Sequence, residues 1–145
     1  MNSRLDYNKV SPEAVKALVN LEKFVSDCGL EKSLLELVKL RASQINGCAY
    51  CVDFHVADAR KAGESERRLF AVALWKDTPF FTERERAALA WTEAVTLLSE
   101  THAPDEVYEE VLKNFSEKET VDLTLAIITI NAWNRLAVSF RKEPK

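Results

Sequence analysis

Glycine and proline occur only between the periodic apolar segments of this 145-residue chain, and this placement restricts the fold more than any other feature. Gly29, Gly47 and Gly63 each follow a segment with helical periodicity, where a helix C-terminus favours a left-handed residue. None of the four prolines interrupts such a segment. An alternating pattern of useful strand length is also missing. The sequence therefore predicts an all-α fold of about six or seven helices.

The helix boundaries follow from apolar periodicity and from N-terminal capping residues. Thr82 with Glu85 and Ser116 with Glu119 have the spacing of capping boxes. An apolar stripe through Val15, Leu18, Val19 and Val25 is expected to face inward from the first helix. The expected helices run from about Pro12 to Cys28, Glu31 to Ile45, Cys48 to Ala62, Ser65 to Trp75, Thr82 to Glu100, Pro104 onward, and Ser116 to Arg141.

The last helix is apolar on nearly every side, which is typical of a helix that is buried all round. Asp122, Asn131, Asn134 and Arg135 interrupt it, so it reads as a core helix and not as a membrane span. Two interpretations remain open for its burial. Helices of the same chain surround it, or a second subunit covers part of it, which would make the protein a homo-oligomer.

Length and charge limit the function classes. One domain over residues 1–145 is expected for this length, without internal repeats or linkers. The net charge of −3 provides no basic surface for nucleic acid and argues against an anionic membrane. The first residues do not resemble a signal peptide, so a cytoplasmic location is expected. In that reducing compartment a close cysteine pair indicates redox chemistry or metal binding.

Such a pair occurs at Cys48 and Cys51, and His55 follows four residues later. Residues three and four apart share a helix face, so these three side chains are expected to form one stripe. At a helix N-terminus a thiol has a lowered pKa and reacts as a nucleophile. One sulfur can then attack a substrate while the other closes a disulfide. His55 can deprotonate Cys51 or stabilise its thiolate.

Glu36 is a further candidate, because apolar residues flank it on both sides. If these neighbours pack in the core, the carboxyl group is partly buried and can relay protons. The alternative is an exposed carboxylate paired with Lys32 or Lys39. A metal centre is disfavoured, because structural zinc sites draw a second ligand pair from a separate segment. No metal or other cofactor is predicted.

The order Glu36, Cys48, Cys51 and His55 follows the pattern Glu-X11-Cys-X2-Cys-X3-His. This pattern resembles the signature of the AhpD-like alkylhydroperoxidases of the carboxymuconolactone decarboxylase superfamily. The segments around residues 40–48 and 130–137 are similar to the same family, so the resemblance covers about residues 10–140. It implies a compact all-α subunit that forms trimers or hexamers.

The resemblance also implies a thiol peroxidase that reduces hydroperoxides through a Cys48–Cys51 disulfide. By analogy, Cys51 is the peroxidatic thiol, Cys48 resolves it, and His55 and Glu36 form the proton relay. A dithiol, such as a lipoyl or thioredoxin-like protein, is the implied reductant. The founding enzymes have a histidine immediately before the second cysteine, whereas this chain has Tyr50. Because a phenol is a poor base at neutral pH, the relay is expected to be shorter and the reductant to differ.

Two other functions are weighed against a peroxidase: a lactone decarboxylase, as in other branches of the superfamily, and a redox-sensing or metal-binding module. The remaining polar residues are given structural roles. Arg135 requires a carboxylate if buried, and Glu36 is one candidate partner. Cys28 is expected to be a small buried residue and His102 a solvated loop residue. Solvated faces are expected at Arg67, Arg68 and the run 83–86.

Overall fold

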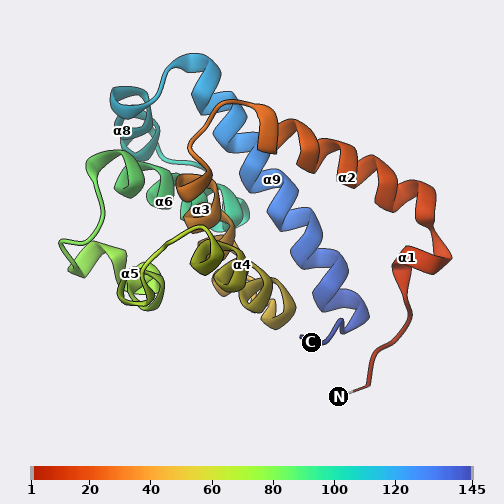
Figure 1. Ribbon diagram of the computed structural model, residues 1–145. Coiled ribbons are helices and arrows are strands. Elements are labelled where there is room, and N and C mark those ends of the chain that lie inside the picture. Colours follow the sequence, from red (N-terminus) through yellow and green to blue (C-terminus); the bar gives the residue numbers. More distant parts are fainter. Residues whose placement is uncertain (1, 145) are drawn as a thin grey trace.

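The computed structural model describes residues 2–144 and contains only helices within that range (Figure 1). The predicted all-α fold is confirmed. The elements are α1 (Tyr7–Val10), α2 (Pro12–Asp27), α3 (Lys32–Ile45), α4 (Ala49–Lys61), α5 (Glu66–Ala71), the 3-10 helix η1 (Val72–Asp77), α6 (Glu83–Thr96), α7 (Leu98–Thr101), α8 (Asp105–Asn114) and α9 (Glu117–Phe140).

Helix α9 runs through the middle of the molecule, with α2 on one side of it and α3 and α4 on the other (Figure 1). The main core lies where α3 and α6 pack on α9, around Leu34, Val38, Trp91, Leu123 and Ile127. A second cluster joins α3 to η1 through Leu37, Val72 and Trp75. The two cores lie on either side of α3, so this helix is held on several faces and forms a rigid support for the segment that follows it.

The helix ends agree closely with the capping residues. Both predicted capping boxes, Thr82 with Glu85 and Ser116 with Glu119, are present, so α6 and α9 begin where expected. Gly47 has a φ of 65°, a left-handed conformation that ends α3 and turns the chain directly into α4. This turn matters for function, because Cys48 is the next residue.

Three boundaries differ from the predicted ones. The short helix α1 was not predicted. The expected helix from Ser65 to Trp75 divides into α5 and η1, and Leu74 inside η1 has non-helical backbone angles. The helix expected to reach Glu100 ends at Thr96, and the hydroxyl of Thr101 donates to the carbonyl oxygen of Ala94, 2.6 Å away. That side-chain bond satisfies one of the last carbonyls of α6 and so stabilises an earlier end.

The single chain does not bury α9 on all sides, so the interpretation in which helices of the same chain surround it is wrong, and cover by a second subunit stays a prediction. Val121 is 60% exposed, and Ile128 and Val138 are also exposed. The apolar stripe of α2 is likewise incomplete, because Val25 is fully buried whereas Val19 is exposed. By length and composition alone α9 could cross a membrane. Its buried side, which includes Leu123, Ile127 and Ile130, instead packs in the core of the helical fold.

Candidate active site at the α3–α4 junction

Cys48 caps the N-terminus of α4 immediately after the left-handed Gly47. Its N–H donates to the carbonyl oxygen of Ser43, 2.9 Å away, so the end of α3 fixes the start of α4. The N–H of Cys51 in turn points at the sulfur of Cys48, 3.2 Å away. Both sulfurs therefore lie at the positive end of a helix dipole, which favours the thiolate form after reduction.

Cys48 and Cys51 form a disulfide, with their Cα atoms 5.3 Å apart. Both residues are buried, and Cys51 is slightly more accessible than Cys48, with exposed fractions of 4% and 1%. Only Cys51 of the pair lines the adjoining cavity. An incoming small molecule therefore meets the sulfur of Cys51, whereas Cys48 lies behind it.

His55 and Glu36 meet directly, with 2.9 Å between Nδ1 of His55 and Oε2 of Glu36. His55 is on α4, one turn after Cys51, and lines the same cavity. Glu36 reaches it from α3 and is largely enclosed. The alternative of an exposed Glu36 on the surface of α3 is therefore wrong. A carboxylate that accepts from Nδ1–H leaves Nε2 as the proton acceptor of the ring.

Lys39 extends this pair into a chain of four charged or polar groups. It is 5% exposed, and its Nζ lies 2.5 Å from Oε1 of Glu22 and 4.0 Å from Oε1 of Glu36. Glu22 comes from α2 and lines the cavity. A buried ammonium needs such partners, because burying a charge without them is costly. The resulting order is His55, Glu36, Lys39 and Glu22, and both ends of it border the cavity.

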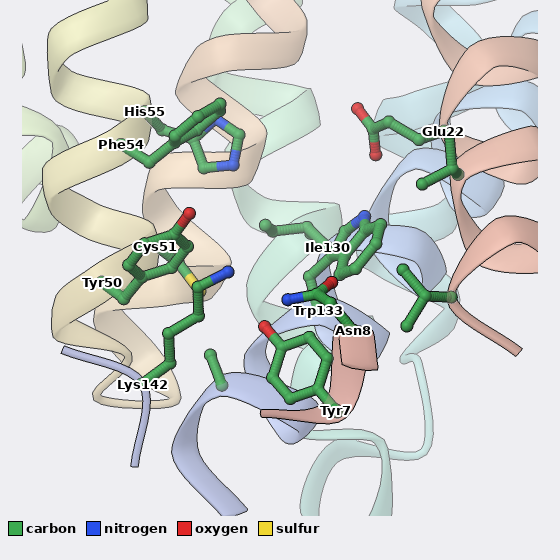
Figure 2. Close-up of a pocket in the computed structure, with 13 residues that line it drawn as sticks. Tyr7, Asn8, Glu22, Tyr50, Cys51, Phe54, His55, Ile130, Trp133 and Lys142 are labelled. Atoms are coloured by element: carbon green, nitrogen blue, oxygen red, sulfur yellow. The ribbon is translucent and has the colours of Figure 1, made fainter. Parts of the chain in front are cut away.

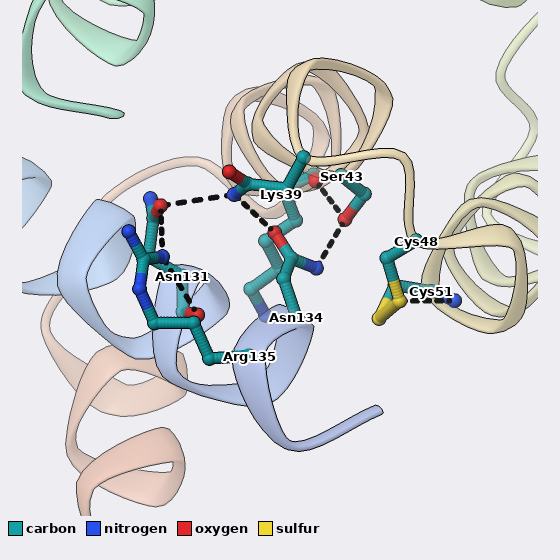
Figure 3. The surroundings of a disulfide bond; sticks show 8 residues. Lys39, Ser43, Cys48, Cys51, Asn131, Asn134 and Arg135 are labelled. Atoms are coloured by element: carbon teal, nitrogen blue, oxygen red, sulfur yellow. Dashed lines mark hydrogen bonds between the residues drawn. A yellow bond between two sulfur atoms is a disulfide. The ribbon is translucent and has the colours of Figure 1, made fainter. Parts of the chain in front are cut away.

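A hydrogen-bonded amide network supports the cysteine turn from the side of α9 (Figure 3). Asn134 is fully buried and donates to Oγ of Ser43, 3.0 Å away. Asn46, at the end of α3, donates to the side-chain oxygens of Asn131 and Asn134, both at 2.9 Å. The buried amide of Asn134 thus has its hydrogen-bond partners, and the network fixes the end of α3 from which Cys48 follows.

Arg135 does not pair with Glu36, which corrects that predicted contact. Its guanidinium donates to the carbonyl oxygen of Asn131 and, at 2.8 Å, to the side-chain oxygen of the same residue (Figure 3). Arg135 is exposed, so it needs no carboxylate. Glu36 is occupied by His55 and Lys39 instead.

A cavity of about 290 Å³ opens beside Cys51 and His55 (Figure 2). Its walls come from α1, α2, α4, α9 and the residues after α9. Apolar groups predominate, with Phe54, Ile130 and Trp133 prominent among them. Tyr7, Tyr50 and Lys142 approach one another near the sulfur of Cys51, whereas the carboxylate of Glu22 lies on the far side of the cavity (Figure 2). Tyr50, which stands where the resemblance expects a histidine, thus borders the cavity directly.

The structure brings together all four predicted site residues, Glu36, Cys48, Cys51 and His55. Sequence reasoning missed Glu22 and Lys142, and it named Lys39 only as a surface partner of Glu36. Lys39 offered a signal, because it sits three residues after Glu36 inside the same apolar run. Glu22 and Lys142 offered none, since their place depends on how α2 and the chain after α9 cross the site.

Two other predicted residues lie away from this site. Cys28 ends α2, is half-buried and packs against the main core. His102 is an exposed loop residue, as expected. Within residues 2–144, no three His, Cys, Asp or Glu side chains are grouped so as to hold a metal ion.

Comparison with known proteins supports the same family. Residues 12–94 match the carboxymuconolactone decarboxylase family. The protein YdfG of Bacillus subtilis, itself uncharacterised, is 39% identical over 139 residues, which span 96% of this chain and 95% of YdfG. The protein YnjA of Escherichia coli is 30% identical over 68% of this chain and 53% of its own length.

Solved structures share the fold. ATU0492 of Agrobacterium tumefaciens, a protein of unknown function suggested to be an AhpD antioxidant defence protein, is 48% identical, covers 99% of both chains and has a TM-score of 0.97. The debrominase Bmp8 has a TM-score of 0.85 at 22% identity, over 94% of this chain and 74% of its own, and shows the fold alone. The chain therefore belongs to the carboxymuconolactone decarboxylase family and has the AhpD-like fold that its sequence predicts.

Proposed function

We propose that this protein is a thiol peroxidase that reduces organic hydroperoxides or hydrogen peroxide through a Cys48–Cys51 disulfide cycle. One observation carries the proposal: Cys51 lines a cavity beside His55, and its sulfur is already bonded to Cys48 behind it. Nucleophile, proton acceptor and resolving thiol thus occupy adjacent positions on α4. The partner of His55 is Glu36, which completes the nucleophile, base and orienting group of an activated thiol.

In the reduced protein, His55 accepts the proton of Cys51 through Nε2, and the helix N-terminus stabilises the thiolate. The thiolate attacks the distal oxygen of the hydroperoxide and the O–O bond breaks. Cys51 becomes a sulfenic acid, and the alkoxide takes the proton from His55 and leaves as an alcohol. Cys48, as a thiolate, then attacks the sulfur of Cys51 and expels hydroxide, which leaves as water once protonated. The product is the disulfide seen here.

An external dithiol completes the cycle by returning two electrons and two protons. A lipoyl-bearing or thioredoxin-like protein of the cytoplasm fits this role, because a dithiol can release the oxidised site by exchange. The histidine expected before Cys51 is Tyr50, so we assign the proton transfer to His55 and Glu36 alone. The exposed apolar residues of α9, Val121 and Ile128, support a homo-oligomer in which another copy covers that face.

The decisive experiment measures thiols and peroxide together. Reduced protein is mixed with a limiting amount of tert-butyl hydroperoxide, and free thiols are counted in wild type, Cys51→Ser, Cys48→Ser and the control Cys28→Ser. Wild type and Cys28→Ser should each lose two thiols per peroxide. Cys51→Ser should lose turnover by at least about a thousandfold, since among residues 2–144 no other cysteine lines the cavity.

The Cys48→Ser variant should accumulate a sulfenic acid at Cys51, which dimedone traps. Full turnover in Cys51→Ser would refute the proposal. Activity on a lactone that survives loss of both cysteines would identify a decarboxylase instead.

A further inference from the structure

Lys142 reaches the cavity because α9 ends in a left-handed residue. Arg141 has a φ of 54° and reverses the chain, and the N–H of Lys142 then donates to the carbonyl oxygen of Ala137, 2.9 Å away. This is the bonding pattern of a Schellman ending. A non-glycine residue in that conformation carries some strain, so the turn is held by its surroundings. The N-terminal segment supplies them, since Arg4 bonds to the carbonyl oxygens of Ser139 and Phe140.

The ammonium of Lys142 lies between two aromatic rings. Its Nζ is 4.2 Å from the ring centroid of Tyr50 and 5.3 Å from that of Tyr7. Burial lowers the pKa of Lys142, but the neighbouring Tyr50 and Tyr7 outweigh it, and the pKa is raised. The side chain is therefore cationic at neutral pH. Aromatic faces attract such a cation without neutralising its charge.

No carboxylate of residues 2–144 lies within 4.0 Å of that ammonium, although the chain is acidic overall. The carboxylates near the cavity are otherwise occupied. Glu22 is held by Lys39 at 2.5 Å, and Glu36 by His55 at 2.9 Å. Among the described residues that line the cavity, the ammonium of Lys142 therefore has no carboxylate partner, and the carboxylate of Glu22 is already paired with Lys39.

The groups around Lys142 are suited to an anion. The hydroxyls of Tyr7 and Tyr50 and the amide of Asn8 can each donate a hydrogen bond, and all three residues line the cavity. Figure 2 shows the amine of Lys142 and the hydroxyl of Tyr7 directed into the same space. On the side of α2 the lining residues are Val15, Val19 and Glu22, of which Glu22 is paired with Lys39, and Trp133 adds apolar surface from α9. A volume of about 290 Å³ suits a small ligand and not a long lipid chain.

We propose that Lys142, with Tyr7, Tyr50 and Asn8, binds the carboxylate of a small amphipathic acid whose apolar body lies against Val19, Ile130 and Trp133. If the proposed peroxidase function holds, the preferred substrate class is a short organic hydroperoxide that carries a carboxylate. Because Lys142 lies beside Tyr50 and Cys51, the carboxylate and the hydroperoxide group are close to each other on such a molecule, and its apolar chain extends away from the sulfur. Lys142 then determines specificity and does not take part in the O–O cleavage.

The test of binding uses the full chain in its disulfide form, without peroxide, so that it does not depend on peroxidase activity. Calorimetry compares octanoate with octan-1-ol, which shares the apolar chain but has no charge. Octanoate should bind wild type at least about tenfold more tightly. Lys142→Gln should abolish this preference, Lys142→Arg should retain it, and the control Lys9→Gln, at an exposed lysine outside the cavity, should not change it.

Equal binding of the two ligands to wild type, or an undiminished preference in Lys142→Gln, would overturn the proposal. If Lys142 merely fastens the end of α9, Lys142→Gln would lower the unfolding temperature while the ratio of the two affinities stays the same. A lower unfolding temperature with an unchanged affinity ratio would therefore also contradict the proposed carboxylate site at Lys142.

The kinetic arm compares 3-hydroperoxyoctanoate, whose hydroperoxide group is near its carboxylate, with its methyl ester under reducing conditions. Wild type should prefer the acid in kcat/KM by about tenfold, and Lys142→Gln should lose this preference mainly through KM. A wild type that binds octanoate yet reduces neither substrate would reject the peroxidase and leave the acid site standing. A wild type that reduces both equally and binds octanoate no better than octanol would reject the acid site alone.

Discussion

The charged groups beside the disulfide and those at the junction of α5, α6 and α8 are arranged in opposite ways. Near the disulfide, Lys39 and His55 are buried and Glu36 lies between them. At the other end, Arg84 binds Glu31 and Glu119, and both carboxylates remain substantially open to solvent. Arg68 binds Glu64 and Glu85 in the same bidentate way, although these two carboxylates are largely enclosed.

The arginines fasten helix ends to one another. Glu85 and Glu119 are the third residues of the two capping boxes, so each guanidinium binds a carboxylate that already caps a helix. Each guanidinium also lies over an aromatic ring, Arg84 over Phe115 at 4.0 Å and Arg68 over Phe81 at 5.0 Å. Such contacts stabilise the packing of helix ends, and among the described residues none of these arginines or carboxylates lines the cavity beside Cys51.

The groups near the disulfide form a path instead. Each has a neighbour that can give or take a proton or hold a charge, and the two ends border the cavity. The comparison teaches that charged residues are placed for chemistry where they are linked to the cavity, and for stability where they join helix ends away from it. The predictions below test that division, beginning with the largest effect.

Replacing His55 with asparagine should lower kcat/KM for tert-butyl hydroperoxide by about 10²–10⁴-fold, the range for loss of a general base. Asparagine keeps a polar group opposite Glu36 but cannot accept the proton of Cys51. The loss should appear equally in the rate at which the reduced protein reacts with iodoacetamide, because both reactions need the Cys51 thiolate. The measurement is a stopped-flow comparison of both rates.

A Glu36→Gln variant is the matched test of the orienting group. It should also lose activity, and the double variant with His55→Asn should be little worse than His55→Asn alone, because the two residues act as one unit. Strictly additive losses would mean that Glu36 acts separately from His55. The contact between Nδ1 of His55 and Oε2 of Glu36 would then have no role in catalysis.

Replacing Lys39 with methionine should cost less activity, about tenfold in kcat/KM, but much stability. Two carboxylates, Glu22 and Glu36, would lose the ammonium between them. Removing one partner of a buried ion pair costs about 3–5 kcal/mol. Urea unfolding measures the stability. The rate of iodoacetamide labelling measures the reactivity of the Cys51 thiolate, at a temperature where the variant is folded.

Lys39→Arg should recover much of both losses, since it restores the positive charge. If Lys39→Met unfolds more easily yet Cys51 reacts at the wild-type rate, Lys39 belongs with the structural charges and not with the site.

Local patterns predicted most helix boundaries and the four residues of the proposed catalytic group. Caps such as Ser116 with Glu119 depend on neighbours in sequence, and Cys48, Cys51 and His55 share a face because of helical spacing alone. Contacts between distant segments were out of reach. Arg84 was predicted to be solvated but contacts Glu31, which lies 53 residues away in the sequence. Glu22 of α2 likewise contacts Lys39 of α3. Helix packing decides which charged residues become enclosed, and apolar periodicity along one helix does not predict how helices pack against each other.

The smallest effect is expected for Arg84→Met, which should leave peroxide reduction unchanged and lower the free energy of unfolding by about 1 kcal/mol at pH 7. Arg84 hydrogen bonds lower the pKa of Glu31 and of Glu119 below the ordinary 4.5. A carboxyl with a lowered folded-state pKa stabilises the fold above its unfolded pKa and loses that contribution as the pH falls through the folded value. The difference in unfolding free energy between wild type and variant should therefore shrink below about pH 4.

Urea unfolding between pH 3 and pH 7 measures this difference. The control is Arg60→Met, which should cost about 0–0.3 kcal/mol, because among the described residues the ion-pair partner of Arg60 is the exposed Glu66. A difference that is constant with pH would assign the effect of Arg84 to packing on Phe115, and a loss of turnover would show that this end of the molecule also serves the site.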